Sequence, residues 1–130
     1  MPDRYEVVLG AGSLRSGSAA AVGFPHAWTA DGVTVEAEFT GAHLLHVAVA
    51  GCVLNDLYRE AAGLGLELAG VRVIAGGGFD TATWVSTGIT YSVELDSAAP
   101  AEELARLVGV VDEVAEIPRA VRAGTPVRRG

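Results

Sequence analysis

The chain has 130 residues, of which 50% are hydrophobic, and its nine basic and sixteen acidic side chains give a net charge of −7. This length and composition predict one domain spanning residues 1–130, with a core large enough to need no disulfide or metal. The basic residues are all arginines scattered along the sequence. Nucleic-acid binding needs a concentrated basic face, so we exclude that class of function.

Neither a membrane span nor a secreted fold is expected. The longest uncharged run, residues 39–55, is shorter than the ~20 residues of a membrane-spanning helix. The single cysteine cannot form an internal disulfide, and the first residues do not have the pattern of a secretory signal. We therefore expect a cytoplasmic protein.

The N-terminal part, residues 1–39, predicts strands. Residues 5–9 are mostly apolar and are followed by Gly10-Ala11-Gly12, which favours a strand followed by a turn. A second strand near residues 19–22 is weaker, because a glycine and a proline follow it closely. Residues 33–39 alternate without a fault, which predicts a strand with one buried and one exposed face. The side chains expected on the buried face are Val33, Val35, Ala37 and Phe39.

Residues 42–65 predict one long helix. No proline interrupts it, Gly51 is the one glycine before Gly63, and apolar residues lie on nearly every side. A helix that is apolar all round belongs in the interior of a protein. Its end is expected at Gly63 or Gly65, because glycine readily takes the left-handed conformation that follows a helix.

The segment 71–96 predicts strands again. Residues 71–75 form one strand, and the three consecutive glycines at 76–78 predict a mobile turn. Residues 81–86 and 89–95 then predict two strands joined through a Thr-Gly pair, or one long strand with a bulge at the glycine. The residues expected to point inward from the last strand are Ile89, Tyr91, Val93 and Leu95.

Residues 100–123 predict the C-terminal helices. Pro100 suits the first position of a helix, acidic residues follow in its first turn, and apolar residues then recur with helical spacing. Pro118 is expected to break this helix and to leave a short turn at residues 119–122. Residues 125–129 are a candidate last strand.

The order of elements predicts an α+β fold with mainly antiparallel strand pairing. An almost wholly apolar helix in so small a domain needs cover on more sides than one sheet provides, and a second copy of the chain is the simplest cover. We therefore predict a homodimer built around the long helix.

Cys52 is the residue around which chemistry is expected. At 100° per residue, its thiol shares a helix face with an acid and a cation. A thiol reacts as the thiolate; a neighbouring cation lowers its pKa, whereas a neighbouring acid raises it. The alternative is a small core residue, because free cysteine is among the most buried residue types. The residues within ~60° of Cys52 on the helix are Leu45, Val49, Asp56 and Arg59.

The sequence resembles the OsmC/Ohr family, whose members carry a cysteine in the middle of a long central helix, then a hairpin, then a helix that runs into a Cys-Pro step. HLLHVAVAGCVLNDLYREAAGLGLELAGVRV is similar to the first part, and TYSVELDS and PAEELARLVGVVDEVAEIPRAV are similar to the second. The likeness covers residues 30–127. It implies an OsmC-like fold, an intertwined homodimer with two sites at the interface and, in the active peroxidases, thiol-based reduction of organic hydroperoxides.

The resemblance assigns roles residue by residue. Cys52 stands at the position of the peroxidatic cysteine, and Arg15, in the turn SLRSGS, corresponds to the family's site arginine. Ile117 stands where the second, resolving cysteine is found, and Ala42 stands where a glutamate is found. The chain is thus similar to a diverged member lacking the second cysteine, which implies that an external thiol would have to reduce an oxidised Cys52.

Three functions stay open. The first is a one-cysteine hydroperoxide reductase in which Cys52, Arg15 and Asp56 are catalytic and an external thiol is the reductant, without a cofactor. The second is a non-peroxidase relative that binds or transforms an apolar small molecule in the dimer-interface pocket, with Asp56, His43 or His46 as acid or base. The third is a structural or partner-binding dimer.

Further candidates to contact the substrate come from aromatic and histidine side chains. Trp28 and Trp84 are candidates to line the pocket, although isolated tryptophans are more often core or interface anchors. Two histidines share an edge of the long helix and His26 offers a third nitrogen, but core histidines are the commoner case and we predict no metal site. The predicted substrate-binding residues are Arg59, His43, His46, Trp28, Trp84 and Ile117.

Overall fold

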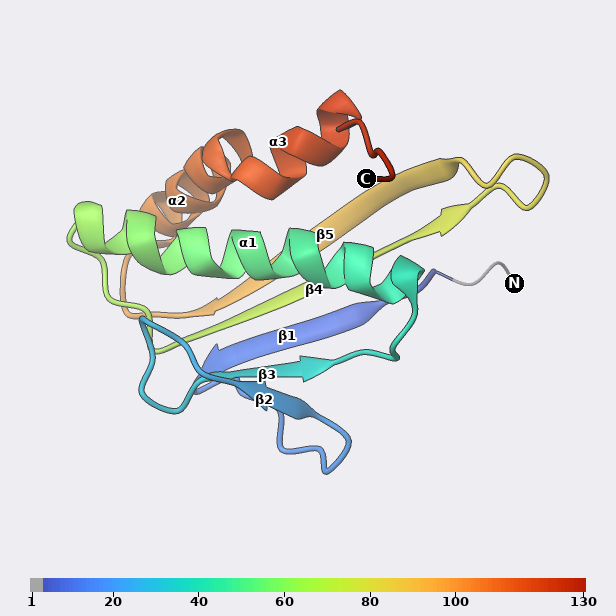
Figure 1. Cartoon of the computed structure of the whole chain (residues 1–130). Coiled ribbons are helices and arrows are strands. Elements are labelled where there is room, and N and C mark those ends of the chain that lie inside the picture. Colours follow the sequence, from blue (N-terminus) through green and yellow to red (C-terminus); the bar gives the residue numbers. More distant parts are fainter. Residues whose placement is uncertain (1–3) are drawn as a thin grey trace.

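The computed structural model describes residues 4–130, in which an antiparallel sheet of five strands lies beneath three helices (Figure 1). The strands are β1 (Val7–Gly12), β2 (Val22–Phe24), β3 (Val33–Glu36), β4 (Gly70–Phe79) and β5 (Ser86–Asp96), in the spatial order β2-β3-β1-β4-β5. The helices are α1 (Gly41–Gly63), α2 (Ala101–Val114) and α3 (Glu116–Ala123). The predicted α+β class and antiparallel pairing are confirmed.

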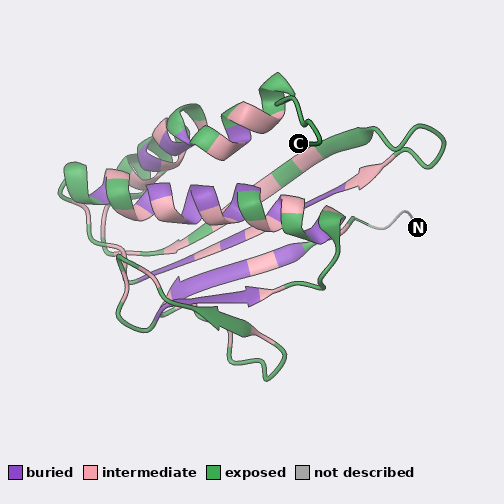
Figure 2. Ribbon diagram, viewed as in Figure 1, coloured by how far each residue is buried: buried purple, intermediate pink, exposed green. Residues whose placement is uncertain are grey.

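The core lies between the sheet and α1 because apolar residues alternate along the central strands. Leu9 of β1 lies opposite Val35 of β3 and Val73 of β4, and all three residues are buried in the core shared with α1. Figure 2 shows buried residues concentrated in the central strands and along α1. Burial of each such side chain contributes about 1.5–3 kcal/mol. The other face is more polar and carries the ion pair between Arg72 and Glu94.

Helix α1 has a defined cap at each end. The Oγ1 atom of Thr40 accepts a hydrogen bond from the main-chain N–H of His43 at 3.1 Å. The helix ends at Gly63, where the N–H of Leu64 returns to carbonyls of the last turn and Gly65 takes a φ of +70°. The helix therefore starts slightly before, and ends slightly before, the predicted range of 42–65.

Two sides of α1 are covered and a third is open. Ala50, Val53 and Leu57 are fully buried in the core, and α2 and α3 contact the helix from beside the sheet. The open side carries Ala48 and Leu44, and the Leu44 side chain is 39% exposed. The apolar residues found all round this helix thus exceed what one copy of the chain covers.

The three glycines at 76–78 belong to β4, so the predicted turn is wrong. A Cβ atom on Gly77 would lie 2.0 Å from the carbonyl oxygen of Gly88, so glycine is needed there for close approach of β5. The predicted strand at 81–86 is wrong too. Residues 80–85 form the hairpin loop, in which Asp80 Oδ1 accepts the N–H groups of Ala82 and Thr83.

The N-terminal strands differ from the predictions in their ends. Strand β1 continues through Gly12 because its main chain pairs with β3 and β4 on either side. Strand β2 begins at Val22, where the predicted strand at 19–22 ends. Strand β3 stops at Glu36, and the side chain of Phe39, expected inside, is 90% exposed.

The C-terminal helices break at Ala115 and not at Pro118. Pro118 lies in the first turn of α3, where its missing N–H has no partner to lose, so proline is tolerated there. The predicted short turn at 119–122 is the second half of this helix. Residues 125–129 form no strand in the described part of the chain, residues 4–130.

Candidate active site around Cys52

Cys52 lies in the middle of α1 on the side that faces α3, and its side chain is 8% exposed. The first residues of α3, Glu116 and Ile117, lie against the sulfur, and their main-chain amides are oriented to stabilise a thiolate. Ile117 therefore stands beside the thiol, where the family resemblance would put a second cysteine.

The surroundings of Cys52 nonetheless favour the neutral thiol. Burial is the largest influence and raises the pKa of Cys52 above its usual value, and the negative charges of Asp56 and Glu116 raise it further. The amides of Ile117 and Glu116 act in the opposite direction but do not reverse the shift. At neutral pH the thiolate fraction in the single chain is small.

Asp56 sits one helical turn after Cys52 and is 3% exposed. Its Oδ2 atom forms an ion pair with Nη2 of Arg59 at 3.0 Å, and Arg59 also contacts Glu60 through Nε at 3.3 Å. Burial raises the pKa of Asp56, and the guanidinium of Arg59 only partly offsets this. The predicted acid and cation thus pair with each other, so Arg59 compensates carboxylates and not the thiol.

An apolar cavity of about 290 Å³ opens next to this group, between α1, β5 and α3. Two lining residues are close in the chain to the surroundings of the thiol: Val49 lies one helical turn before Cys52, and Pro118 directly follows Ile117. Cys52 itself is not among the lining residues. The volume is at the lower end of the range for small-molecule sites. The cavity is lined by Val49, Ser86, Gly88, Ile89, Tyr91, Pro118, Val121 and Arg122.

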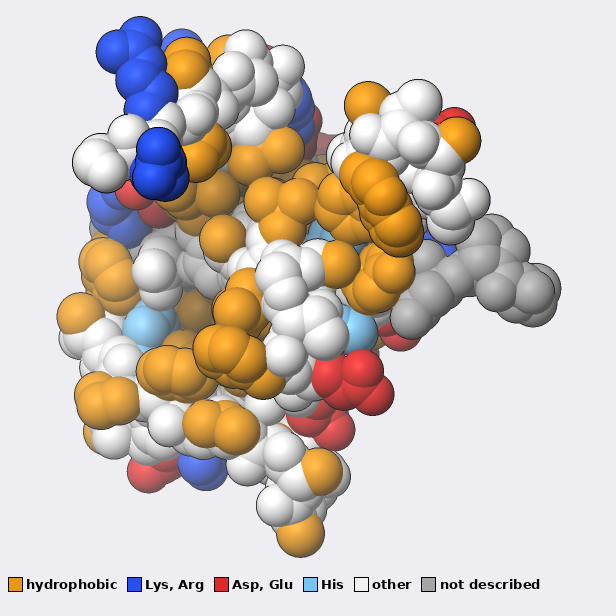
Figure 3. Space-filling view, turned by 45° about the vertical axis from the view of Figure 1, so that its right-hand side comes forward, with side chains coloured by type: hydrophobic (Ala, Val, Ile, Leu, Met, Phe, Trp, Pro, Cys, Tyr) orange, Lys and Arg blue, Asp and Glu red, His pale blue; other side chains and the backbone are white. Residues whose placement is uncertain are grey.

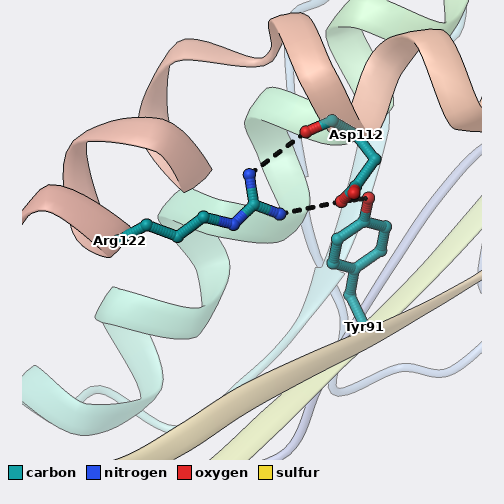
Figure 4. A network of polar contacts seen from close by, with 3 residues as sticks. All are labelled: Tyr91, Asp112 and Arg122. Carbon is teal, nitrogen blue, oxygen red and sulfur yellow. Dashed lines mark hydrogen bonds and ion pairs between the residues drawn. The ribbon is translucent and has the colours of Figure 1, made fainter.

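A polar network bounds one end of the cavity and was not anticipated from the sequence. Tyr91 of β5 and Arg122 of α3 both donate hydrogen bonds to Oδ1 of Asp112 in α2 (Figure 4). The alternation of β5 correctly predicted that Tyr91 points inward. The ten-residue separation of Asp112 and Arg122 gives no recognisable pattern, because the sharp corner at Ala115 is what brings the two side chains together.

Several predicted site residues lie elsewhere. Arg15 is exposed in the turn after β1, and its main-chain N–H bonds to the carbonyl of Gly12 at 3.2 Å. The charges that act on the Cys52 thiol come from Asp56 and Glu116, and Arg15 is not among them. Trp84, 68% exposed, lies in the β4–β5 hairpin loop with a φ of +60°.

His43 and His46 lie one helical turn apart on α1, and His26 lies elsewhere. His43 is buried at the start of α1, with Nδ1 2.6 Å from Thr40 Oγ1. His46 is 1% exposed, and burial lowers its pKa. His26 lies next to Trp28, and its Nε2 is 2.9 Å from Asn55 Oδ1. No three histidine, cysteine or acidic side chains gather in a metal-binding arrangement within residues 4–130.

The same part of the chain contains no helix that is both long and apolar enough to cross a bilayer.

Comparisons with known proteins agree with this architecture. The family model described as "OsmC-like protein" matches residues 32–129. No curated protein sequence matches the chain. The crystal structure of an OsmC-like hydroperoxide resistance protein from Jannaschia sp. CCS1 is similar over 97% of this chain and 93% of its own, with a TM-score of 0.53 and 15% identity. At that identity, the similarity to the Jannaschia protein concerns the fold alone.

Proposed function

The chain belongs to the OsmC-like protein family, and from this premise we propose that it is a homodimeric hydroperoxide reductase that works with one cysteine and an external thiol. The observation that carries the proposal is the position of Cys52. Its sulfur lies between α1 and the first turn of α3, two helices that also supply walls of the apolar cavity, with Asp56 one helical turn away. A nucleophile, a proton carrier and a pocket for an apolar substrate therefore share one place.

The chemistry takes three steps. The Cys52 thiolate attacks one oxygen of the hydroperoxide, the O–O bond breaks, and the products are a sulfenic acid and an alkoxide, which takes a proton to become the alcohol. An external thiol then attacks the sulfenic acid, releasing water and leaving a mixed disulfide. A second external thiol attacks this disulfide, so that Cys52 returns as a thiol and the two external thiols leave joined to each other.

Asp56 is suited to move the proton. It is buried, and its raised pKa brings the carboxyl closer to neutral pH than an exposed aspartate, which is the condition for general acid–base catalysis. It accepts the proton from the thiol before the attack and returns it to the alkoxide afterwards. The same negative charge opposes the thiolate, so a cation from outside the single chain is needed to make Cys52 reactive at neutral pH.

In this proposal, a second copy of the chain supplies that cation and also covers the open side of α1. Figure 3 shows hydrophobic side chains gathered on the side of the molecule that carries the start of α1 and the β4–β5 hairpin. Phe39, just before α1, is 90% exposed, and Trp84 and Val85 of the hairpin loop are 68% and 64% exposed; apolar side chains exposed on one side of a protein favour an interaction site there. Arg15, exposed on its turn, is the proposed arginine that reaches the thiol across the dimer.

The direct test is peroxide consumption by the purified protein with cumene hydroperoxide and dithiothreitol. We expect turnover in the wild type, loss to the level of the blank in Cys52→Ser, and no change in Glu113→Gln, a substitution of an exposed carboxylate on α2. Trapping with dimedone should label Cys52 after peroxide treatment. Equal turnover in Cys52→Ser, or a wild type without turnover whose Cys52 cannot be labelled, would refute the proposal.

A second function is favoured by one observation: burial, reinforced by the carboxylates of Asp56 and Glu116, raises the pKa of Cys52 and so favours the neutral thiol. In this alternative, the cysteine is a packing residue and the cavity binds an uncharged apolar molecule. Mass spectrometry of the native protein would detect a co-purified ligand, and Val121→Phe, which fills the cavity from α3, should abolish its binding. Hydroperoxide turnover that depends on Cys52 would rule this alternative out.

A further inference from the structure

Three structural elements meet at the carboxylate of Asp112, in the last turn of α2. Its Oδ1 atom accepts a hydrogen bond from the hydroxyl of Tyr91 at 2.5 Å and one from Nη2 of Arg122 at 2.8 Å. Nη1 of Arg122 also donates to the main-chain carbonyl of Asp112 at 3.1 Å (Figure 4). The bond from Tyr91, followed by those from Arg122, holds the pKa of Asp112 below its usual value, so the carboxylate is ionised at neutral pH.

Apolar packing alone holds α3 only weakly. The helix has eight residues, of which Pro118 alone is buried while Ile117 and Val121 are half-buried. It follows α2 after a single residue, Ala115. A helix this short is not stable by itself in water, so its place depends on what fastens it to its neighbours. The contacts of Arg122 with Asp112 are charge-assisted hydrogen bonds and fasten the C-terminal end of α3.

The opposite end of α3 is the part that covers the thiol. The main-chain amides of Glu116 and Ile117 lie against Cys52, and Pro118 and Val121 form part of the neighbouring cavity wall. Because α3 spans only about two turns, freeing one end lets the whole helix move as a unit. The fastening at Arg122 and the cover over Cys52 are therefore two ends of one small rigid body.

We propose that Asp112 is a positioning residue that holds α3 over Cys52 and so sets access to the thiol and to the cavity beside it. Asp112 lies outside the cavity lining and acts through Tyr91 and Arg122. Its importance for turnover rests on the proposed peroxidase function. The positioning role itself concerns access to the sulfur and is measurable without any turnover.

The test is the rate at which iodoacetamide alkylates Cys52 in the folded protein, compared between wild type and Asp112→Ala. We expect alkylation at least tenfold faster in Asp112→Ala, because an opened α3 both exposes the sulfur and relieves the burial that raises its pKa. Amide hydrogen exchange should rise in residues 116–123 and stay unchanged in β4. Tyr91→Phe, which removes one hydroxyl, should give a smaller increase and serves if Asp112→Ala does not fold.

The matched control is Glu113→Ala, which removes the exposed carboxylate of the next residue on the same helix and should leave alkylation and exchange as in wild type. Alkylation of Asp112→Ala within twofold of wild type would overturn the proposal, as would exchange that rises equally in β4 and α3, since that pattern means global unfolding. If the protein shows no peroxide turnover, the alkylation rates still test the positioning role of Asp112. Conversely, unchanged alkylation in a protein that turns over peroxide refutes the positioning role alone.

Discussion

Replacing Ile117 by cysteine tests directly whether α3 begins beside Cys52. The main-chain amide of Ile117 lies against the Cys52 sulfur, so a thiol at this position should form a disulfide with Cys52 under mild oxidation. The bond would close a loop of about 65 residues, for which chain entropy gives about 4 kcal/mol of stabilisation. The lost packing of the half-buried isoleucine offsets about 1 kcal/mol of this.

The net gain of about 3 kcal/mol corresponds to a rise in Tm of about 10 °C for a chain of 130 residues. The measurement is thermal unfolding followed by circular dichroism on oxidised and reduced Ile117→Cys, with Ile117→Ser as the control for lost packing. Free thiols are counted in parallel. Two free thiols that persist after oxidation would show that residue 117 does not lie beside Cys52, as would an oxidised variant that unfolds at or below the Tm of the reduced one.

The remaining predictions concern titration, a proton carrier and a close contact. Because the pKa of Cys52 is raised, its alkylation rate should still be increasing at pH 9; a plateau below pH 8 would contradict this. Asp56→Asn should speed alkylation at pH 7 while slowing peroxide turnover, and a parallel change in both rates would argue against proton transfer by Asp56. The lowered pKa of His46 means that the unfolded chain binds more protons below about pH 6.5, so the protein should lose stability as the pH falls from there. His46→Leu should weaken this pH dependence of the free energy of unfolding, measured by denaturant titration. An unchanged pH dependence would assign the effect to other groups. Gly77→Ala should destabilise the protein by about 1–3 kcal/mol through contact with the Gly88 carbonyl, whereas Gly17→Ala, in open space, should not. Equal denaturation midpoints of the two variants would show that β5 can move away.

The sequence was most informative where local pattern and tertiary environment agree. The run from residue 42 onward lacks proline and has a capping threonine before it, so α1 forms close to where periodicity predicts it. The alternation in residues 89–95 likewise gives the right inward residues of β5. The prediction from sequence failed at Gly76-Gly77-Gly78. Glycine there allows strands β4 and β5 to approach closely, and without knowledge of the partner strand this use of glycine looks the same as a turn.

Only part of the candidate site could be predicted from the sequence. Helical spacing alone puts Asp56 and Arg59 on the helix face of Cys52, so these were found, but their mutual ion pair at 3.0 Å depends on rotamers that spacing does not fix. Ile117 was identified from the family pattern. The carboxylate of Glu116, which acts on the thiol, was missed because the helix was expected to break at Pro118 and not before Glu116.

Both tryptophans lie outside the core, Trp28 with 46% and Trp84 with 68% of the side chain exposed. The indole emission of Trp84 therefore reports on the surface of the protein. Trp84, held outward on the hairpin loop, becomes an intrinsic optical label for whatever docks there. A shift of emission to shorter wavelength as the protein concentration rises would register association of chains without any added dye.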